Sequence, residues 1–167
     1  MSLVAQDAVP EEGAAAQPAG DEAHMRLALE AARRAGLAGE PPIGACLVRG
    51  GKVIATASNC VISSLDITAH AEIALIREAC RRERTLEFAG CDLYVTVEPC
   101  PMCYAASHYA RIGRIVYGAS LGDLQALTGT ELTGARRPEG AGPALSGGLL
   151  REESLALLRR WAGGGSR

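Results

Sequence analysis

Two short motifs, about thirty residues apart, constrain the fold of this chain more than any other feature. The first is His70-Ala71-Glu72, and the second is Pro99-Cys100-Pro101-Met102-Cys103. Histidine and cysteine side chains are common protein ligands of zinc, and a site with three of them keeps a fourth position for water. A fold that uses both motifs must bring one imidazole and two sulfurs to a single point, beside the carboxylate of Glu72.

The spacing of the ligands predicts where they lie on the secondary structure. Cys100 and Cys103 are three residues apart, so both sulfurs can lie on one face of a helix. Pro101 suits the first turn of that helix, where free N–H groups and the helix dipole favour thiolates. His70 follows Thr68, which we expect to cap another helix. The sequence therefore predicts two helix starts that converge on one zinc ion.

Glu72 distinguishes a catalytic metal site from a structural one. Zinc lowers the pKa of a bound water to about 7, and a carboxylate beside the open position can take a proton from that water. Proton transfer of this kind typically contributes about 10²–10⁴-fold in rate. The zinc-protease motif His-Glu-x-x-His is excluded, because Glu72 follows His70 by two positions and residue 74 is alanine.

Other interpretations of the cysteines stay open at this point. A zinc-stabilised interaction domain would need a fourth protein ligand, which Cys60, Cys80 or Cys91 could supply. A redox-active Cys-x-x-Cys pair would bind no metal and would respond to mild oxidant. Six cysteines could also form three disulfides in a small secreted domain. The length of the chain and the lack of a signal-like start favour reduced thiols and a cytoplasmic location.

Length and composition indicate one domain with tails. A chain of 167 residues can bury one real core. Residues 1–20 are rich in Ala, Gly, Pro and acids and predict a disordered tail, residues 21–162 form the domain, and residues 163–167 form a flexible tail. No apolar run of about eighteen residues occurs, so we expect no membrane span.

The pattern along the chain alternates between helices and strands. We expect helices over residues 21–36, 68–84, 101–111 and 152–161, strands over 43–48, 53–57, 91–97 and 114–117, and loops over 59–67 and 134–148. Gly50-Gly51 suits a tight hairpin turn between the first two strands. This order predicts an α/β fold, a three-layer α/β/α sandwich whose central sheet is mixed because it opens with a hairpin.

From about Met25 to Leu121 the sequence resembles the cytidine deaminase-like superfamily. Within it, the chain is similar to the branch of tRNA adenosine deaminases, guanine deaminases and fungal-type cytosine deaminases. The matching stretches are residues 41–45, Asn59, residues 68–72, residues 93–103 and residues 111–119. His-x-Glu followed by Pro-Cys-x-x-Cys is the signature of zinc-dependent nucleobase deaminases.

The resemblance implies the roles of individual residues. His70, Cys100 and Cys103 would hold one Zn²⁺ per subunit of a homodimer. Glu72 would shuttle protons during attack of zinc hydroxide on an amino-substituted base, with release of ammonia. Asn59 and Ala71 would contact the substrate. The alternative role of Asn59, at the end of a strand, is that of a turn residue.

Shorter stretches of the sequence, compared with individual branches of the superfamily, bear on the choice of substrate. The stretch from Glu98 to Cys103 is similar to guanine deaminases, whereas residues 111–114 and 149–161 are more like the tRNA enzymes. Residues 120–125 depart from the tRNA pattern, and Lys52 is the only lysine, so phosphate contacts would need arginine. We therefore expect a small-molecule base or nucleoside as substrate, with guanine or a related aminopurine first. The alternative is adenosine at the wobble position of tRNA, which would become inosine.

Overall fold

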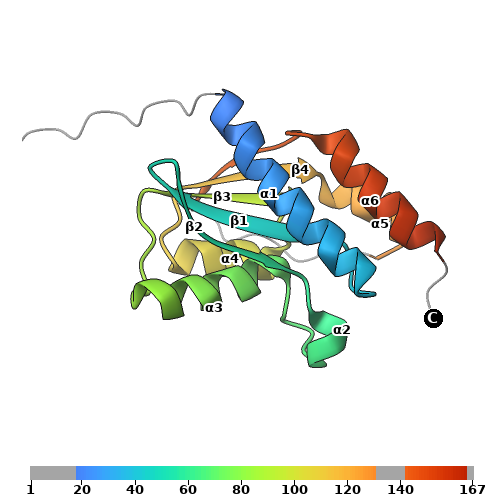
Figure 1. The fold of residues 1–167 in the computed structure, drawn as a ribbon, viewed down its shortest axis with the longest axis horizontal. Helices are drawn as coiled ribbons and strands as arrows, with labels where there is room; N and C mark the ends of the chain where they lie inside the picture. Colours follow the sequence, from blue (N-terminus) through green and yellow to red (C-terminus); the bar gives the residue numbers. More distant parts are fainter. Residues whose placement is uncertain (1–17, 131–141, 165–167) are drawn as a thin grey trace, which may run out of the picture.

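The computed structural model describes residues 18–130 and 142–164. Its elements follow the alternation expected from the sequence (Figure 1). They are α1 (Pro18–Leu37), β1 (Gly44–Arg49), β2 (Lys52–Ser58), α2 (Val61–Ser64), α3 (Ala71–Glu83), β3 (Cys91–Val97), α4 (Pro101–Tyr109), β4 (Arg114–Ala119), α5 (Leu121–Thr128), β5 (Ala144–Ser146) and α6 (Arg151–Gly163).

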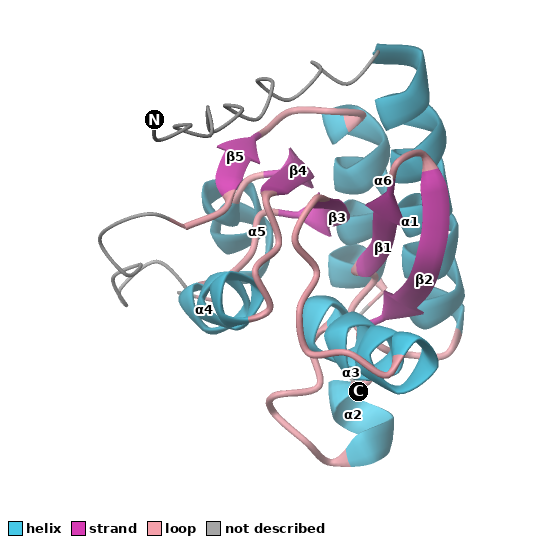
Figure 2. Ribbon diagram, turned by 90° about the vertical axis from the view of Figure 1, so that its left-hand side faces the viewer, coloured by secondary structure: helices cyan, strands magenta, loops and turns pink. Residues whose placement is uncertain are grey.

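A mixed sheet with the strand order β2-β1-β3-β4-β5 forms the middle layer. β1 runs antiparallel to both β2 and β3, whereas β3, β4 and β5 are parallel. Helices α1 and α6 cover one face of the sheet, and α3 and α4 lie on the other (Figure 2). The predicted three-layer α/β/α sandwich with a mixed sheet is confirmed.

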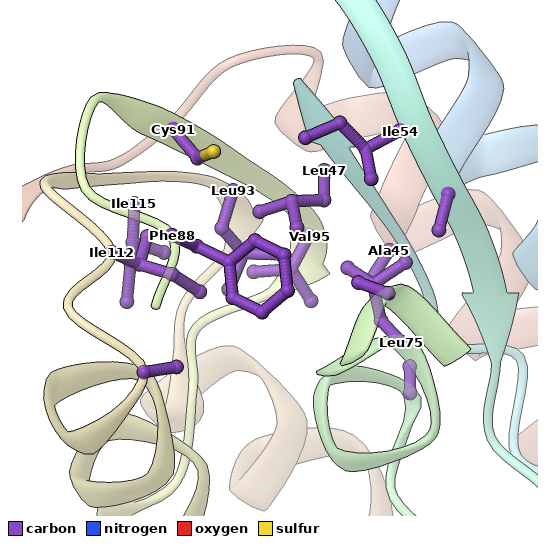
Figure 3. Close-up of a cluster of buried hydrophobic side chains, with 14 of the residues drawn as sticks. Ala45, Leu47, Ile54, Leu75, Phe88, Cys91, Leu93, Val95, Ile112 and Ile115 are labelled. Carbon is purple, nitrogen blue, oxygen red and sulfur yellow. The ribbon is translucent and has the colours of Figure 1, made fainter. Parts of the chain in front are cut away.

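Alternating strand residues build a separate core on each face of the sheet, because successive side chains of a strand point to opposite sides. Leu93 and Val95 of β3 pack on the α3 and α4 side with Phe88, and Figure 3 shows these side chains together. Tyr94, which lies between them in the sequence, packs with Met25 of α1 on the opposite side. β3 is therefore buried on both faces, as its almost continuous apolar sequence requires.

The hairpin and most element boundaries agree with the sequence. Gly50 and Gly51 have φ values of 54° and 79°, which glycine adopts without strain and which a tight hairpin needs. The predicted cap of α3 was wrong. Its N-cap is His70, because the amide and hydroxyl of Thr68 are turned toward the carboxylate of Asp66, at 2.9 and 2.7 Å.

Three short elements were not expected. α2 lies within the predicted loop 59–67, and β5 lies within the predicted loop 134–148, of which residues 134–141 are outside the described part. α5 begins with a capping box formed by Ser120 and Asp123.

The predicted boundaries of the domain and its tails remain predictions. A disordered tail was predicted over residues 1–20. Residues 18–20 belong to α1, and residues 1–17 lie outside the described part. The C-terminal tail was predicted to begin at Gly163, which is the last residue of α6, and residues 165–167 also lie outside. None of the described helices is both long and apolar enough to span a bilayer.

The start of β1 lies against the backbone of α1. A Cβ at Gly44 would collide with the carbonyl oxygen of Ala28 and the amide nitrogen of Ala32. We predict that Gly44→Ala lowers the free energy of unfolding by about 1–3 kcal/mol, because overpacking forces the helix away from the sheet. Chemical denaturation would measure the loss. Gly20→Ala is the matched control, since a Cβ there has no neighbour within 4 Å, and it should be neutral or stabilising.

Asp21 ties the first turn of α1 to the sheet. Its carboxylate accepts two 2.9 Å hydrogen bonds from Arg114, and these bonds hold the pKa of Asp21 below its usual value although burial opposes them. The stabilisation is present above the unfolded pKa of about 3.9 and is lost as the pH falls through the lower folded pKa.

We therefore predict that Arg114→Gln lowers the free energy of unfolding by about 1–2 kcal/mol at pH 7. The difference from the unsubstituted protein should shrink as the pH falls from 5 toward 3. Denaturation curves across this range would show it. A difference that did not depend on pH would contradict the assignment to Asp21, and Arg81→Gln, in an exposed ion pair, should change little.

Candidate active site

A recess opens at one edge of the sheet, where β2, β3 and β4 end. In α/β sheets this carboxyl edge is the usual place for ligands. The recess is shallow: its enclosed volume is about 20 Å³, and about 290 Å³ when the open space at its mouth is included. It is lined by Ile43, Asn59, His70, Glu72, Val97, Glu98, Cys100, Leu121 and Leu124. Residues from both predicted motifs therefore meet in one hollow.

The three predicted metal ligands lie together. His70 is the N-cap of α3, Cys100 is the N-cap of α4, and Cys103 lies in the first turn of α4. Their ligand atoms all lie within 4.8 Å of one another. His70 Nδ1 is 3.6 Å from the sulfur of Cys100 and 3.5 Å from that of Cys103. The predicted convergence of two helix starts is present in the structure.

These distances fit a zinc ion. Zinc forms bonds of about 2.3 Å to sulfur and about 2.0 Å to nitrogen. At tetrahedral angles these bonds place each sulfur about 3.5 Å from the imidazole nitrogen. One imidazole and two thiols form a donor set that suits zinc and leaves a coordination position free. Among the described residues, no fourth His, Cys, Asp or Glu joins the cluster, so a four-ligand structural site has no support there.

The two sulfurs shift each other's pKa in opposite directions, through the thiol proton of Cys103. The hydrogen bond from the Cys103 thiol, together with His70, lowers the pKa of Cys100 to about 4, although burial opposes the shift. The same bond and burial raise the pKa of Cys103. A dication bound by both sulfurs would take the place of this proton. All six cysteines are free thiols, so the structure contains no disulfide between the pair.

Glu72 is a buried carboxyl group beside the ligands. It lies in the first turn of α3 and is only 3% exposed, yet it lines the recess. Burial raises its pKa to about 7, and the negative charge of Cys100 adds to the shift. A carboxyl group that titrates near neutral pH is suited both to accept a proton and to donate one.

The two predicted substrate contacts are placed differently. Asn59 is 4% exposed and lines the recess, and its side-chain oxygen accepts a 3.1 Å hydrogen bond from the amide of Val61. Ala71 is fully buried, and its side chain packs in the core on the α3 side. Any contact of Ala71 with a substrate would have to come from its backbone.

Part of the recess was not predicted from the sequence. Leu121 and Leu124 of α5 form one wall, and Glu98 accepts a 3.0 Å hydrogen bond from the amide of Leu121. Ser120 followed by Asp123 is a capping-box signal that could have revealed α5. Nothing local in the sequence indicates that this helix lies beside His70.

A sequence profile of the cytidine and deoxycytidylate deaminase zinc-binding region matches residues 18–119, more than half of the chain. The chain belongs to this family. The resemblance seen in the two motifs is thereby confirmed, and His70, Cys100 and Cys103 form the candidate zinc site of the domain.

Named relatives extend the comparison. The tRNA-specific adenosine deaminase of Agrobacterium fabrum is 55% identical over 95 residues, which are 57% of this chain and 62% of that protein. The chain thus matches less than two thirds of that relative. A solved structure from a study of A-to-I editing by tRNA deaminases at the wobble position is 40% identical. The match covers 81% of this chain and 98% of that one, with a TM-score of 0.68.

The expectation of guanine or a related aminopurine as substrate was wrong. Guanine deaminase from Nitrosomonas europaea has a TM-score of 0.77 and covers 98% of both chains, but it is only 27% identical. Several relatives named as tRNA-specific adenosine deaminases are 44% to 55% identical, and the tRNA deaminase structure is 40% identical. Some of the residues that favoured guanine lie at helix starts: Pro101 is the first residue of α4, and Ser120 and Asp123 cap α5.

The metal cluster makes a direct prediction. His70→Ala should lose bound zinc, because two thiolates alone leave the site short of a ligand. Metal content of the purified protein, measured by mass spectrometry, would check this. His108→Ala is the matched control, since His108 is exposed on α4 and is not part of the cluster, and it should keep its zinc. Equal zinc content in the two variants would contradict the ligand assignment.

Proposed function

We propose that this protein is a zinc-dependent deaminase that converts adenosine at the wobble position of tRNA into inosine. The observation that carries the deamination chemistry is the placement of buried Glu72 in the same recess as a three-ligand zinc cluster. The choice of substrate is supported by the high identity with proteins named as tRNA adenosine deaminases.

Different residues of the recess would bind the metal and transfer protons. His70, Cys100 and Cys103 would hold the zinc, which lowers the pKa of a bound water to about 7. Glu72 takes a proton from that water and delivers it to a ring nitrogen of the base. The water oxygen would bond to the ring carbon, and Glu72 would move the second proton of that oxygen to the amino group, so that the bond between the ring carbon and the amino nitrogen breaks and ammonia leaves.

The other walls bind the base. Asn59 would hydrogen-bond to the edge of the adenine, and Ala71 would contribute through its backbone. Leu121 and Leu124 also line the recess and provide an apolar surface. The tRNA would turn its wobble nucleotide out of the anticodon loop toward the recess and leave its phosphates outside.

The proposal includes a homodimer. Met102 and Tyr109 are exposed apolar residues of α4, and they are seven positions apart, which places them on one face of the helix. An exposed apolar surface commonly marks a protein interface. Association through α4 would bring a second subunit close to the first turn that carries Cys103.

Inosine formation in tRNA tests the proposal. The protein should convert wobble adenosine in a tRNA substrate, and Glu72→Gln should lower the rate by about 10²–10⁴-fold while zinc content is retained. Sequencing of the product would measure conversion. Glu87→Gln, at an exposed glutamate, should remain active. Ammonia release from free guanine without any inosine in tRNA would overturn the proposed substrate, and full activity of Glu72→Gln would overturn the mechanism.

A further inference from the structure

A buried carboxylate behind the recess takes no part in the chemistry proposed above. Glu40 lies between α1 and β1 and is 4% exposed. Its two oxygens accept hydrogen bonds from the amides of Ile62 and Ser63, at 2.9 and 2.7 Å. Its own amide donates to the carbonyl of Ala35 at the end of α1, at 3.0 Å. Glu40 therefore joins α1 to α2, which lie more than twenty residues apart in the sequence.

α2 depends on such external partners. It has four residues, too few for a helix to form independently. Helix starts leave their first N–H groups without partners, and here side chains supply them. Asn59 accepts from Val61, and Glu40 accepts from the next two residues. Burial raises the pKa of Glu40, but the hydrogen bonds from Ser63 and Ile62 outweigh it and hold the pKa below its usual value. The group is therefore an anion at neutral pH, and an anion is favourable at a helix N-terminus.

The same arrangement fixes the orientation of Asn59. Only the carbonyl end of its amide can accept from the backbone N–H of Val61, so the NH₂ end is left to donate. Because Asn59 lines the recess, a fixed α2 limits the directions in which that donor can point. Movement of α2 would change the position of Val61 and, with it, the orientation of Asn59.

We propose that Glu40 is a positioning residue of the base pocket: by holding the first turn of α2, it orients the Asn59 amide toward the substrate base. The inference rests on the proposed function, since it assigns Asn59 to the bound base. Glu40 itself does not line the recess and would not contact the substrate. Its loss should therefore weaken base binding and orientation, and should leave zinc binding and the protons carried by Glu72 unaffected.

A double-mutant cycle would test the proposal. Glu40→Gln replaces one acceptor oxygen with an NH₂ group that faces a backbone N–H. We expect kcat/KM for inosine formation to fall by about 10- to 100-fold, in line with the loss of a charged hydrogen bond, with unchanged zinc content and pH profile. Asn59→Ala should cause a loss of similar size. Adding Glu40→Gln to Asn59→Ala should cost little more, because Glu40 acts through Asn59. Glu87→Gln again serves as the exposed control.

A second measurement does not depend on activity. Amide hydrogen exchange of residues 59–65 should become faster in Glu40→Gln, while exchange of β3 stays the same. Glu40→Asp, which keeps the charge but shortens the side chain, should show an intermediate effect and replaces Glu40→Gln if that variant does not fold. Unchanged exchange, fully additive losses in the cycle, or loss of zinc would each overturn the inference. Absence of inosine formation in the unsubstituted protein would overturn the proposed function instead, and the exchange result would still decide the role of Glu40 in α2.

Discussion

The meeting of two helix starts at one edge of the sheet is the constraint on which the rest of the structure depends. His70 begins α3 and Cys100 begins α4, and their ligand atoms lie 3.6 Å apart. The strand order makes this possible, because β1 is antiparallel to both of its neighbours. β2 and β3 therefore both end where β1 begins, and the segments that lead into α3 and α4 leave the sheet on either side of that point.

The opposite layer holds the same edge in place. Gly44 starts β1 against the backbone of α1, and its amide donates a 3.1 Å hydrogen bond to the buried hydroxyl of Thr96 on β3. The close approach of α1 and β1 thus fixes the position of the first residue of β1 relative to α1 and β3. Glu40, four residues earlier, extends this connection to α2. The candidate metal ligands come from the starts of α3 and α4, whereas Asn59, which also lines the recess, hydrogen-bonds to α2, and Glu40 joins α2 to α1.

The elements and ligands that could be predicted from the sequence are those that depend on nearby residues. β3 was placed correctly because its apolar run is continuous, and the ligands were found because their residue types and spacing have few other uses. α2 could not be predicted, since the group that satisfies its N–H donors lies about twenty residues upstream at Glu40. β5 has three residues and exists only through its pairing with β4. The roles of Leu121 and Leu124 in the recess depend likewise on tertiary packing that no local pattern indicates.

The wrong prediction of the substrate indicates which parts of the protein can distinguish adenosine in tRNA from free guanine. Structures of a tRNA deaminase and of a guanine deaminase both resemble this fold, so the fold by itself cannot separate the two substrates. Residues at helix starts are poor indicators as well, because capping and the first turn limit their identity whatever the substrate is. Discrimination must come from the groups that face the base and from the surface outside the recess. Under the proposed function these groups are Asn59 and the leucines of α5, which line the recess, and the orientation of Asn59 would depend on Glu40, which does not line it.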